Sequence, residues 1–246
     1  MNVAALESYA NRFYGYGSWN QPIWFVGMEE GGCSTLAEFE LRLNAWIDRG
    51  CCDLEDAQSY HRAINMGGFF KEGARLQKTW EKLIRIYLTQ QKRPNETEDL
   101  RRFQINEFGR RDGGFASLEL FALPSYSTTK WIYSDVVDLP FLINREVYKY
   151  YLYPRRAEEL RRRIQMHRPA HVVIYGVDYR HEWEGIVRKK FVNVEKLPRA
   201  IEAHLDSTHV LVVPHPVSYG IEKSYWNDVG THLKDMDAAA VGLPAT

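Results

Sequence analysis

Cysteine is scarce in this chain of 246 residues, and its spacing excludes the usual sites built from cysteine. The three cysteines are Cys33, Cys51 and Cys52, an odd number without a Cys-x-x-Cys pair. A disulfide framework, a four-cysteine zinc site and an iron–sulfur cluster all require other numbers and spacings. The sequence therefore predicts no structural metal, no cofactor and a reducing, cytoplasmic setting.

Long apolar runs and a net charge are also missing. No run of about 18 apolar residues occurs, so we expect no transmembrane helix and no membrane partner. Residues 1–12 lack the basic start and the apolar core of a signal peptide. Basic and acidic residues number 32 each, so no global field attracts nucleic acid, and any site for a polyanion must be local.

What the chain does contain is an alternation of short apolar runs with segments of helical spacing. Runs rich in β-branched and aromatic residues predict parallel strands near 23–26, 117–123, 171–175 and 210–213. Helices are expected over 3–14, 34–49, 53–64, 95–108, 145–168, 178–190 and 225–235, with another opening at 77 or 79 and a frayed tail after Ala238. Such alternation is typical of an α/β protein with a parallel sheet and helices on both faces. No linker divides the chain, so we expect one domain over residues 1–246.

Polar residues follow two of the predicted strands. Gly27, Met28, Glu29 and Glu30 come directly after the first, and His215 follows the last. The carboxyl ends of parallel strands meet at one edge of a sheet, where open α/β sheets bind ligands. A carboxylate there can act as a general base or hold a water molecule. The alternative is that the first segment is an acidic turn and that His215 only shapes a turn between prolines.

Three further segments leave two readings each. Phe69 and Phe70, flanked by glycines, are either a mobile stacking loop or two residues of the core. The hydroxyl-rich segment 124–131 either contacts phosphates or is an ordinary connection. The arginine-rich helix over 145–168 is interpreted as a solvated face rather than a phosphate-binding face.

Two short motifs resemble the signature loops of the uracil-DNA glycosylase superfamily. Residues 27–31, Gly-Met-Glu-Glu-Gly, are similar to a first loop that reads roughly Gly-x-acidic-or-amide-Pro-Gly after the first strand. Residues 215–219, His-Pro-Val-Ser-Tyr, are similar to the His-Pro-Ser loop after the last strand. Residues 123–128, Leu-Pro-Ser-Tyr-Ser-Thr, stand where the family has a polar middle loop. The resemblance covers about residues 23–225.

This resemblance implies a three-layer α/β/α fold, with a central four-stranded parallel sheet and a nucleobase pocket at its carboxyl edge. It also implies a monomer that flips a base out of single- or double-stranded DNA and hydrolyses its N-glycosidic bond. Glu29 matches the position that orients or activates the attacking water. His215 matches the residue that stabilises the negative charge on the departing base. Tyr219 matches a wedge that fills the gap left by the flipped base.

The chain also departs from the family pattern. Glu30 replaces the usual proline, and we expect it to raise the local negative charge. Val217 replaces the usual serine, and the four cluster cysteines of some relatives are missing. No asparagine stands near the end of the second strand to read the base, so Glu119 or Ser125 takes that place and alters base choice.

The candidate residues and the alternatives follow from these matches. Besides the catalytic pair Glu29 and His215, the expected substrate-binding residues are Gly27, Met28, Glu30, Phe69, Phe70, Glu119, Ser125 and Tyr219. The departures keep open a non-catalytic domain that binds nucleic acid or a nucleobase through the same pocket. The zero net charge keeps open an unrelated α/β domain that binds a small metabolite.

Overall fold

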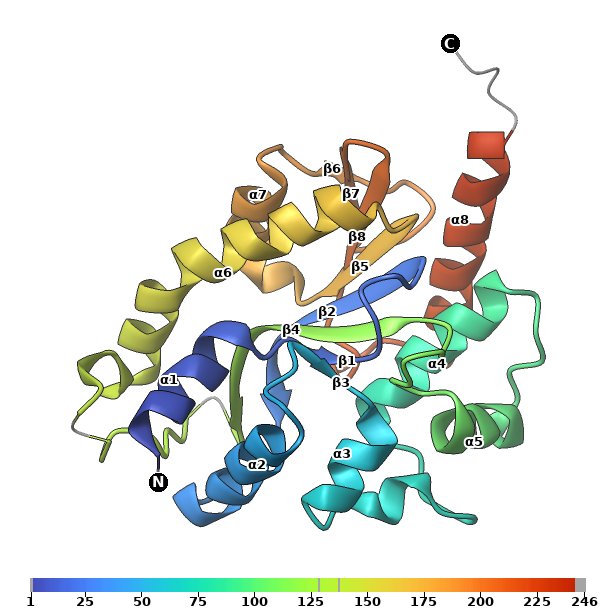
Figure 1. Ribbon diagram of the computed structural model, residues 1–246. Coiled ribbons are helices and arrows are strands. Elements are labelled where there is room, and N and C mark those ends of the chain that lie inside the picture. The colour runs from blue at the N-terminus through green and yellow to red at the C-terminus, as the bar shows by residue number, and fades with distance from the viewer. Residues whose placement is uncertain (1, 128, 137, 242–246) are drawn as a thin grey trace.

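A computed structural model describes residues 2–127, 129–136 and 138–241. One eight-stranded sheet runs through it in the order β3-β1-β4-β2-β5-β8-β7-β6 (Figure 1). The strands are β1 Gly15–Tyr16, β2 Ile23–Gly31, β3 Leu54–Glu55, β4 Ala116–Ser125, β5 His171–Tyr175, β6 Val192–Asn193, β7 Ile201–Leu205 and β8 Thr208–Val213. The prediction of an α/β protein is confirmed.

The four expected strands form the centre of this sheet. β4, β2, β5 and β8 are neighbours in that order, and each adjacent pair is parallel. The prediction of a four-stranded sheet was wrong in number, because β3 and β1 extend one edge and β7 and β6 the other. β1 and β7 run antiparallel to their central neighbours, so the sheet is mixed. Strands of two residues are too short for a periodic pattern to predict.

Helices cover both faces of the sheet (Figure 1). They are α1 Val3–Arg12, α2 Leu36–Asp48, α3 Ala57–Ala63, α4 Lys78–Gln90, α5 Thr97–Asn106, α6 Arg145–His167, α7 Arg180–Val187 and α8 Lys223–Val241, with 3₁₀ turns η1 Gly67–Phe70, η2 Pro140–Leu142 and η3 Val177–Tyr179. α1, α6 and α7 lie on one side, and α4, α5 and α8 on the other. Among the described residues, no helix combines the length and the apolar character that a membrane span requires.

Side-chain caps explain where several helices begin. Thr35, rather than the expected Ser34, caps α2 by accepting the Glu38 N–H at 3.2 Å. The expected helix over 53–64 starts later, because residues 54–55 pair with β1 and Asp56 caps α3. At the other end of the chain, α8 continues past Ala238, where fraying was expected. Residues 242–246 lie outside the described part.

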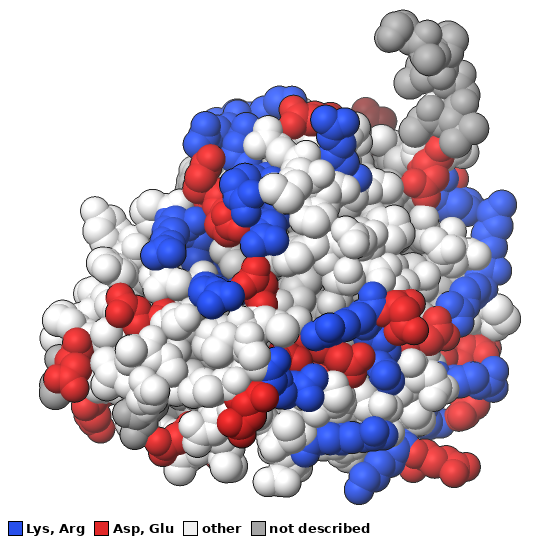
Figure 2. Space-filling model, in the orientation of Figure 1, with Lys and Arg blue, Asp and Glu red and all other residues white. Residues whose placement is uncertain are grey.

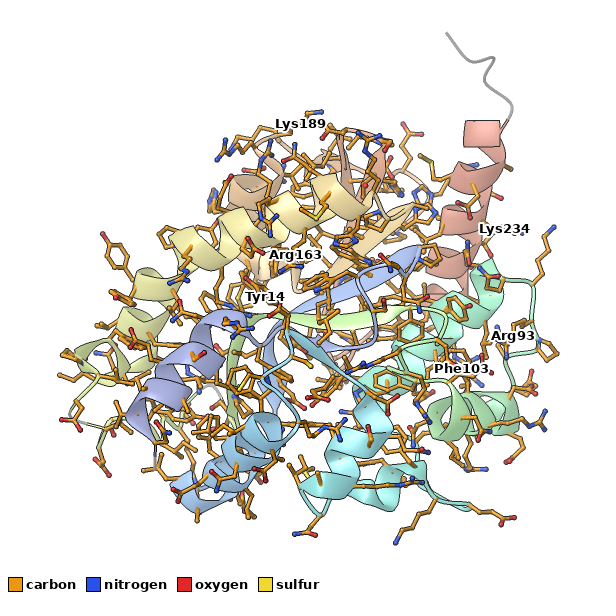
Figure 3. All side chains as sticks on the ribbon, viewed as in Figure 1. Tyr14, Arg93, Phe103, Arg163, Lys189 and Lys234 are labelled. Carbon is orange, nitrogen blue, oxygen red and sulfur yellow. The ribbon has the colours of Figure 1, made fainter. Side chains whose placement is uncertain are left out.

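The arginine-rich helix α6 is not only a solvated face, so that interpretation was wrong in part. Arg156 is fully buried, and its guanidinium donates to the backbone carbonyls of Ala10 and Phe13. Its Cζ lies 3.9 Å from the ring centroid of Tyr14. Arg163 lies near Tyr14, where α6 passes the end of α1 (Figure 3). These arginines join α6 to the sheet and to α1 and so fix the position of α6. The same helix supplies cations to the candidate site described in the next subsection.

The order of the central strands reverses direction at β2. The chain passes from β2 to β4 on one side of it, and then to β5 on the other side. In open α/β sheets, ligands bind outside the carboxyl ends of the strands at such a reversal. Glu29 and Glu30 were expected in a loop after the first strand. β2 extends to Gly31, so both residues belong to its carboxyl end instead. The pairing with β4 is irregular between Glu29 and Gly31.

Candidate functional site

A cavity of about 590 Å³ opens at the carboxyl ends of the central strands. Both predicted signature segments line it, through Glu29, Glu30 and His215. Glu119 of β4 and Tyr175 of β5 line it as well. A second cavity of about 340 Å³ shares Glu29, Glu30, Tyr175 and His215 with the first. Segments far apart in the sequence therefore meet around one hollow of a size typical of ligand sites.

The base of the cavity is formed by a hydrogen bond between β4 and β5, the two strands that flank β2. Tyr175 Oη donates to Glu119 Oε1 at 2.9 Å, across the backbone of Gly27. A Cβ atom on Gly27 would collide with both side chains. Glycine at this position is therefore required by the close approach of Glu119 and Tyr175, which explains one glycine of the first motif.

Glu119 has an oxygen without a partner. Its Oε2 atom is buried and makes no hydrogen bond to the described residues. Burial raises the pKa of Glu119 well above its usual 4.5, and the nearby carboxylates of Glu30 and Glu29 raise it further, against the lowering effect of the Tyr175 hydroxyl. The neutral form is therefore favoured. A neutral carboxyl group offers one O–H donor and one carbonyl acceptor side by side.

Glu29 is held by two cations from the first turns of α6. Arg145 contacts its Oε2 at 2.6 Å, and Lys149 contacts its Oε1 at 2.7 Å. Asn144 caps α6 by accepting the Val147 N–H, which sets the direction in which this turn leaves the loop. A carboxylate held in this way is fixed in position, and each oxygen retains a lone pair for a water molecule.

Glu30 is likewise compensated within the protein. Tyr16 Oη donates to its Oε1 at 2.8 Å, and Arg42 Nη1 donates to its Oε2 at 3.1 Å. The Arg42 side chain is only 4% exposed. The negative charge that we expected Glu30 to add is thus paired within the protein, because a buried guanidinium lies beside it.

His215 lies exposed at the edge of the cavity, with its ring edge-on to Tyr175 at 5.5 Å between centroids. The backbone N–H of Val217 donates to His215 Nδ1 at 3.3 Å. Since Nδ1 accepts, the proton of the neutral ring is on Nε2. Partial loss of hydration lowers the pKa of His215, which favours this neutral form. The ring thus presents one N–H donor to a ligand.

The two adjacent phenylalanines have different places. Phe69 lines the cavity together with Trp80 of α4, and their ring centroids are 5.4 Å apart. Phe70 is buried against His61 and Trp80 and does not line the cavity. The core reading therefore holds for Phe70, whereas Phe69 packs against the core and also lies in the wall of the cavity. His61 Nδ1 lies 2.7 Å from the Ala57 carbonyl, which leaves Nε2 of the neutral ring as an acceptor.

The remaining expected residues lie at or beyond the margin of the site. Met28 lines the smaller cavity. Ser125 also lines it, but its hydroxyl is bound to Arg145, which in addition holds the Ser127 and Lys130 carbonyls at 2.6 and 2.7 Å. The hydroxyl-rich segment is thus anchored by a cation of the protein itself; Thr128 in it is outside the described residues. Tyr219 is fully exposed.

Sequence reasoning missed Arg42, Arg145, Lys149, Tyr175 and Trp80. Tyr175 is the last residue of a predicted strand, so its place at the carboxyl edge was available from the same rule that found Glu29. Arg145 and Lys149 begin a predicted helix that was interpreted as solvated. No local pattern distinguishes Arg42 or Trp80 from ordinary helix residues, since only packing brings them to the cavity.

Charges on the face seen in Figure 2 are mixed, with basic and acidic side chains interspersed. The formal net charge is also zero, so attraction of a polyanion would depend on local cations, such as those beside the cavity. Lys149 is 24% exposed, and Lys130 lies with its ammonium 5.8 Å from the ring centroid of Tyr126, an exposed residue that lines the cavity. No protein-family model and no curated protein sequence matches the chain.

Proposed function

We propose that the protein is a monomeric N-glycosylase that flips uracil or another altered base out of DNA into the larger cavity and hydrolyses its glycosidic bond. The observation that carries this proposal is the meeting of Glu29, Glu119 and His215 around one cavity. The resemblance of residues 27–31 and 215–219 to the uracil-DNA glycosylase superfamily supports it, as does the parallel order of the four central strands.

The two catalytic roles follow from how charge develops in the reaction. As the bond between base and sugar breaks, the sugar gains oxocarbenium character and the base becomes an anion. His215, with its proton on Nε2, donates to that anion. Glu29 stabilises the sugar cation and holds the attacking water. The water oxygen bonds to the sugar carbon, and the released proton neutralises the departed base.

Recognition of the base is assigned to Glu119 in its neutral form. Uracil, hypoxanthine and xanthine each carry a carbonyl beside an N–H. A carboxylic acid matches such an edge with two hydrogen bonds, because its O–H donates to the carbonyl and its own carbonyl accepts from the N–H. Trp80 and Phe69 offer aromatic surface on which a flipped base can stack. Glu119 thus replaces the amide that many relatives use.

A second candidate function is binding of a base or of nucleic acid without cleavage. The observation that favours it is that both oxygens of Glu29 already contact Arg145 and Lys149. Should these cations hold Glu29 away from the sugar, the cavity would bind a base without activating water.

The test is incubation with single- and double-stranded oligonucleotides that contain uracil, hypoxanthine or xanthine, followed by cleavage at abasic sites. We expect product from at least one base, lost in His215→Ala and retained in His181→Ala, which changes an exposed histidine of α7. Tight binding without product, unchanged by Glu29→Gln, would instead establish the binding function. DNA binding that is absent, or that does not weaken with salt, would exclude both cleavage and binding of DNA, and would leave only binding of a free base.

A further inference from the structure

A second cluster of polar residues lies at the opposite, amino-terminal edge of the central strands. His171 of β5, His209 of β8 and His204 of β7 stand in one row, because the sheet register pairs them. Helix α8 packs over this row with His232 and Asp237. His171 and His209 are each 3% exposed, so the cluster belongs largely to the interior.

Three side chains of the cluster point their ligand atoms at one another. Glu202 Oε2 lies 3.0 Å from His209 Nε2 and 2.8 Å from His232 Nε2, and all three atoms lie within 4.8 Å of one another. They come from three elements, β7, β8 and α8. Donors of a tetrahedral zinc ion, each about 2.0–2.2 Å from the metal, are about 3.4 Å apart. The observed separations, 2.8 and 3.0 Å for two pairs and at most 4.8 Å for the third, bracket that spacing.

The polar contacts in this cluster outnumber the protons that its two buried imidazoles can share. Glu202, His209, His171 and Asp237 form a chain of three contacts, at 3.0, 3.2 and 2.9 Å. Each contact needs a proton between its two atoms, but two neutral imidazoles supply only two.

A metal ion removes this shortage. With the ion on His209 Nε2, His209 Nδ1–H donates to His171 Nδ1, and His171 Nε2–H donates to Asp237. Every contact of the chain is then satisfied by neutral imidazoles. This is the usual arrangement around histidine ligands, whose second ring nitrogen donates to a neighbouring acceptor that fixes the tautomer.

We propose that Glu202 Oε2, His209 Nε2 and His232 Nε2 bind one divalent zinc ion, with His171 and Asp237 as positioning residues. Two imidazoles and one carboxylate are ligands that suit zinc, and a water molecule completes the tetrahedron. The ion joins α8 to β7 and β8. The sequence predicted no metal because positions 202, 209 and 232 have no motif spacing. The register of the sheet and the packing of α8 bring them together.

The test uses the full chain, stripped with a chelator and then titrated with Zn²⁺ or Co²⁺. We expect one ion per chain, a tetrahedral Co²⁺ absorption spectrum, and a melting temperature that rises with zinc concentration. His232→Ala should abolish stoichiometric binding. Asp237→Asn, at a partly exposed position, should weaken it by about 10- to 100-fold while the chain stays folded by circular dichroism. His181→Ala is the matched control and should bind as the wild type does.

Two outcomes would overturn the proposal. One is a folded, stripped chain that takes up no stoichiometric zinc or cobalt. The other is binding that His232→Ala and Asp237→Asn leave unchanged. The site lies at the other edge of the sheet from the cavity, so excision of a base and binding of zinc can each be present without the other.

Discussion

The two ends of strand β5 each contact a carboxyl group, but with different consequences. At the amino end, His171 contacts Asp237 and also His209, which continues the chain of contacts to Glu202. At the carboxyl end, Tyr175 contacts Glu119, whose second oxygen has no partner among the described residues and which lines a cavity. We propose a cation for the first cluster and a base for the second. One scaffold thus supports two kinds of site.

The largest effect is expected from His215→Ala, which tests whether the carboxyl end is catalytic. Loss of one donor to the departing base should lower the rate of single-turnover cleavage by a factor of about 10²–10³. Affinity for substrate should change little, because the base carries no full charge before the bond breaks. Single-turnover rates and binding of the same oligonucleotide give both values. A loss of binding as large as the loss of rate would make His215 a structural residue.

The next effect is expected from Arg145→Met, which tests whether the carboxyl end depends on cations from α6. The ion pair of Arg145 and Glu29 is largely buried, with side chains 10% and 9% exposed. Removing one partner of such a pair costs about 3 kcal/mol. Arg188→Met breaks an exposed pair with Glu158 and should cost less than about 1 kcal/mol. Urea unfolding of both variants measures the difference, and equal costs would show that Lys149 alone suffices for Glu29.

The same comparison shows what sequence could and could not predict. Strand ends and short motifs predicted Glu29 and His215 at one edge, because the rule for parallel sheets needs only element order. The partners of these residues were not predictable: Arg42 and Arg145 reach the site through packing of whole helices. The histidine cluster was missed for a similar reason, since antiparallel β7 was not recognised and its register brings Glu202 beside His209.

Glu119→Gln tests whether the open carboxyl group is neutral. Because the folded state raises its pKa, the stability that Glu119 contributes is complete below its usual pKa of 4.5 and is lost as pH rises toward the folded value. Glutamine keeps a donor and an acceptor but does not titrate. The melting temperature of the variant should therefore rise relative to that of the wild type as the pH increases from 5 to 8. The variant should also keep its base-excision activity. The groups that face Glu119 are Tyr175, Glu29, Glu30 and Arg156. A pH-independent difference in melting temperature would mean that Glu119 is ionised throughout.

Tyr219→Ala should have the smallest effect and separates the edge of the cavity from its interior. The Tyr219 side chain is fully exposed, so its removal should leave the melting temperature unchanged. As a wedge, the ring would fill the stack after a base is flipped, and one lost stacking contact should weaken duplex binding about tenfold. Cleavage of single strands should be mostly spared, because no stack has to be filled. Tyr150→Ala, at a position of α6 that is 85% exposed, is the control. It should change neither duplex binding nor cleavage of single strands. Equal losses for Tyr219→Ala on single- and double-stranded substrates would remove the wedge assignment and leave the cavity itself as the whole site.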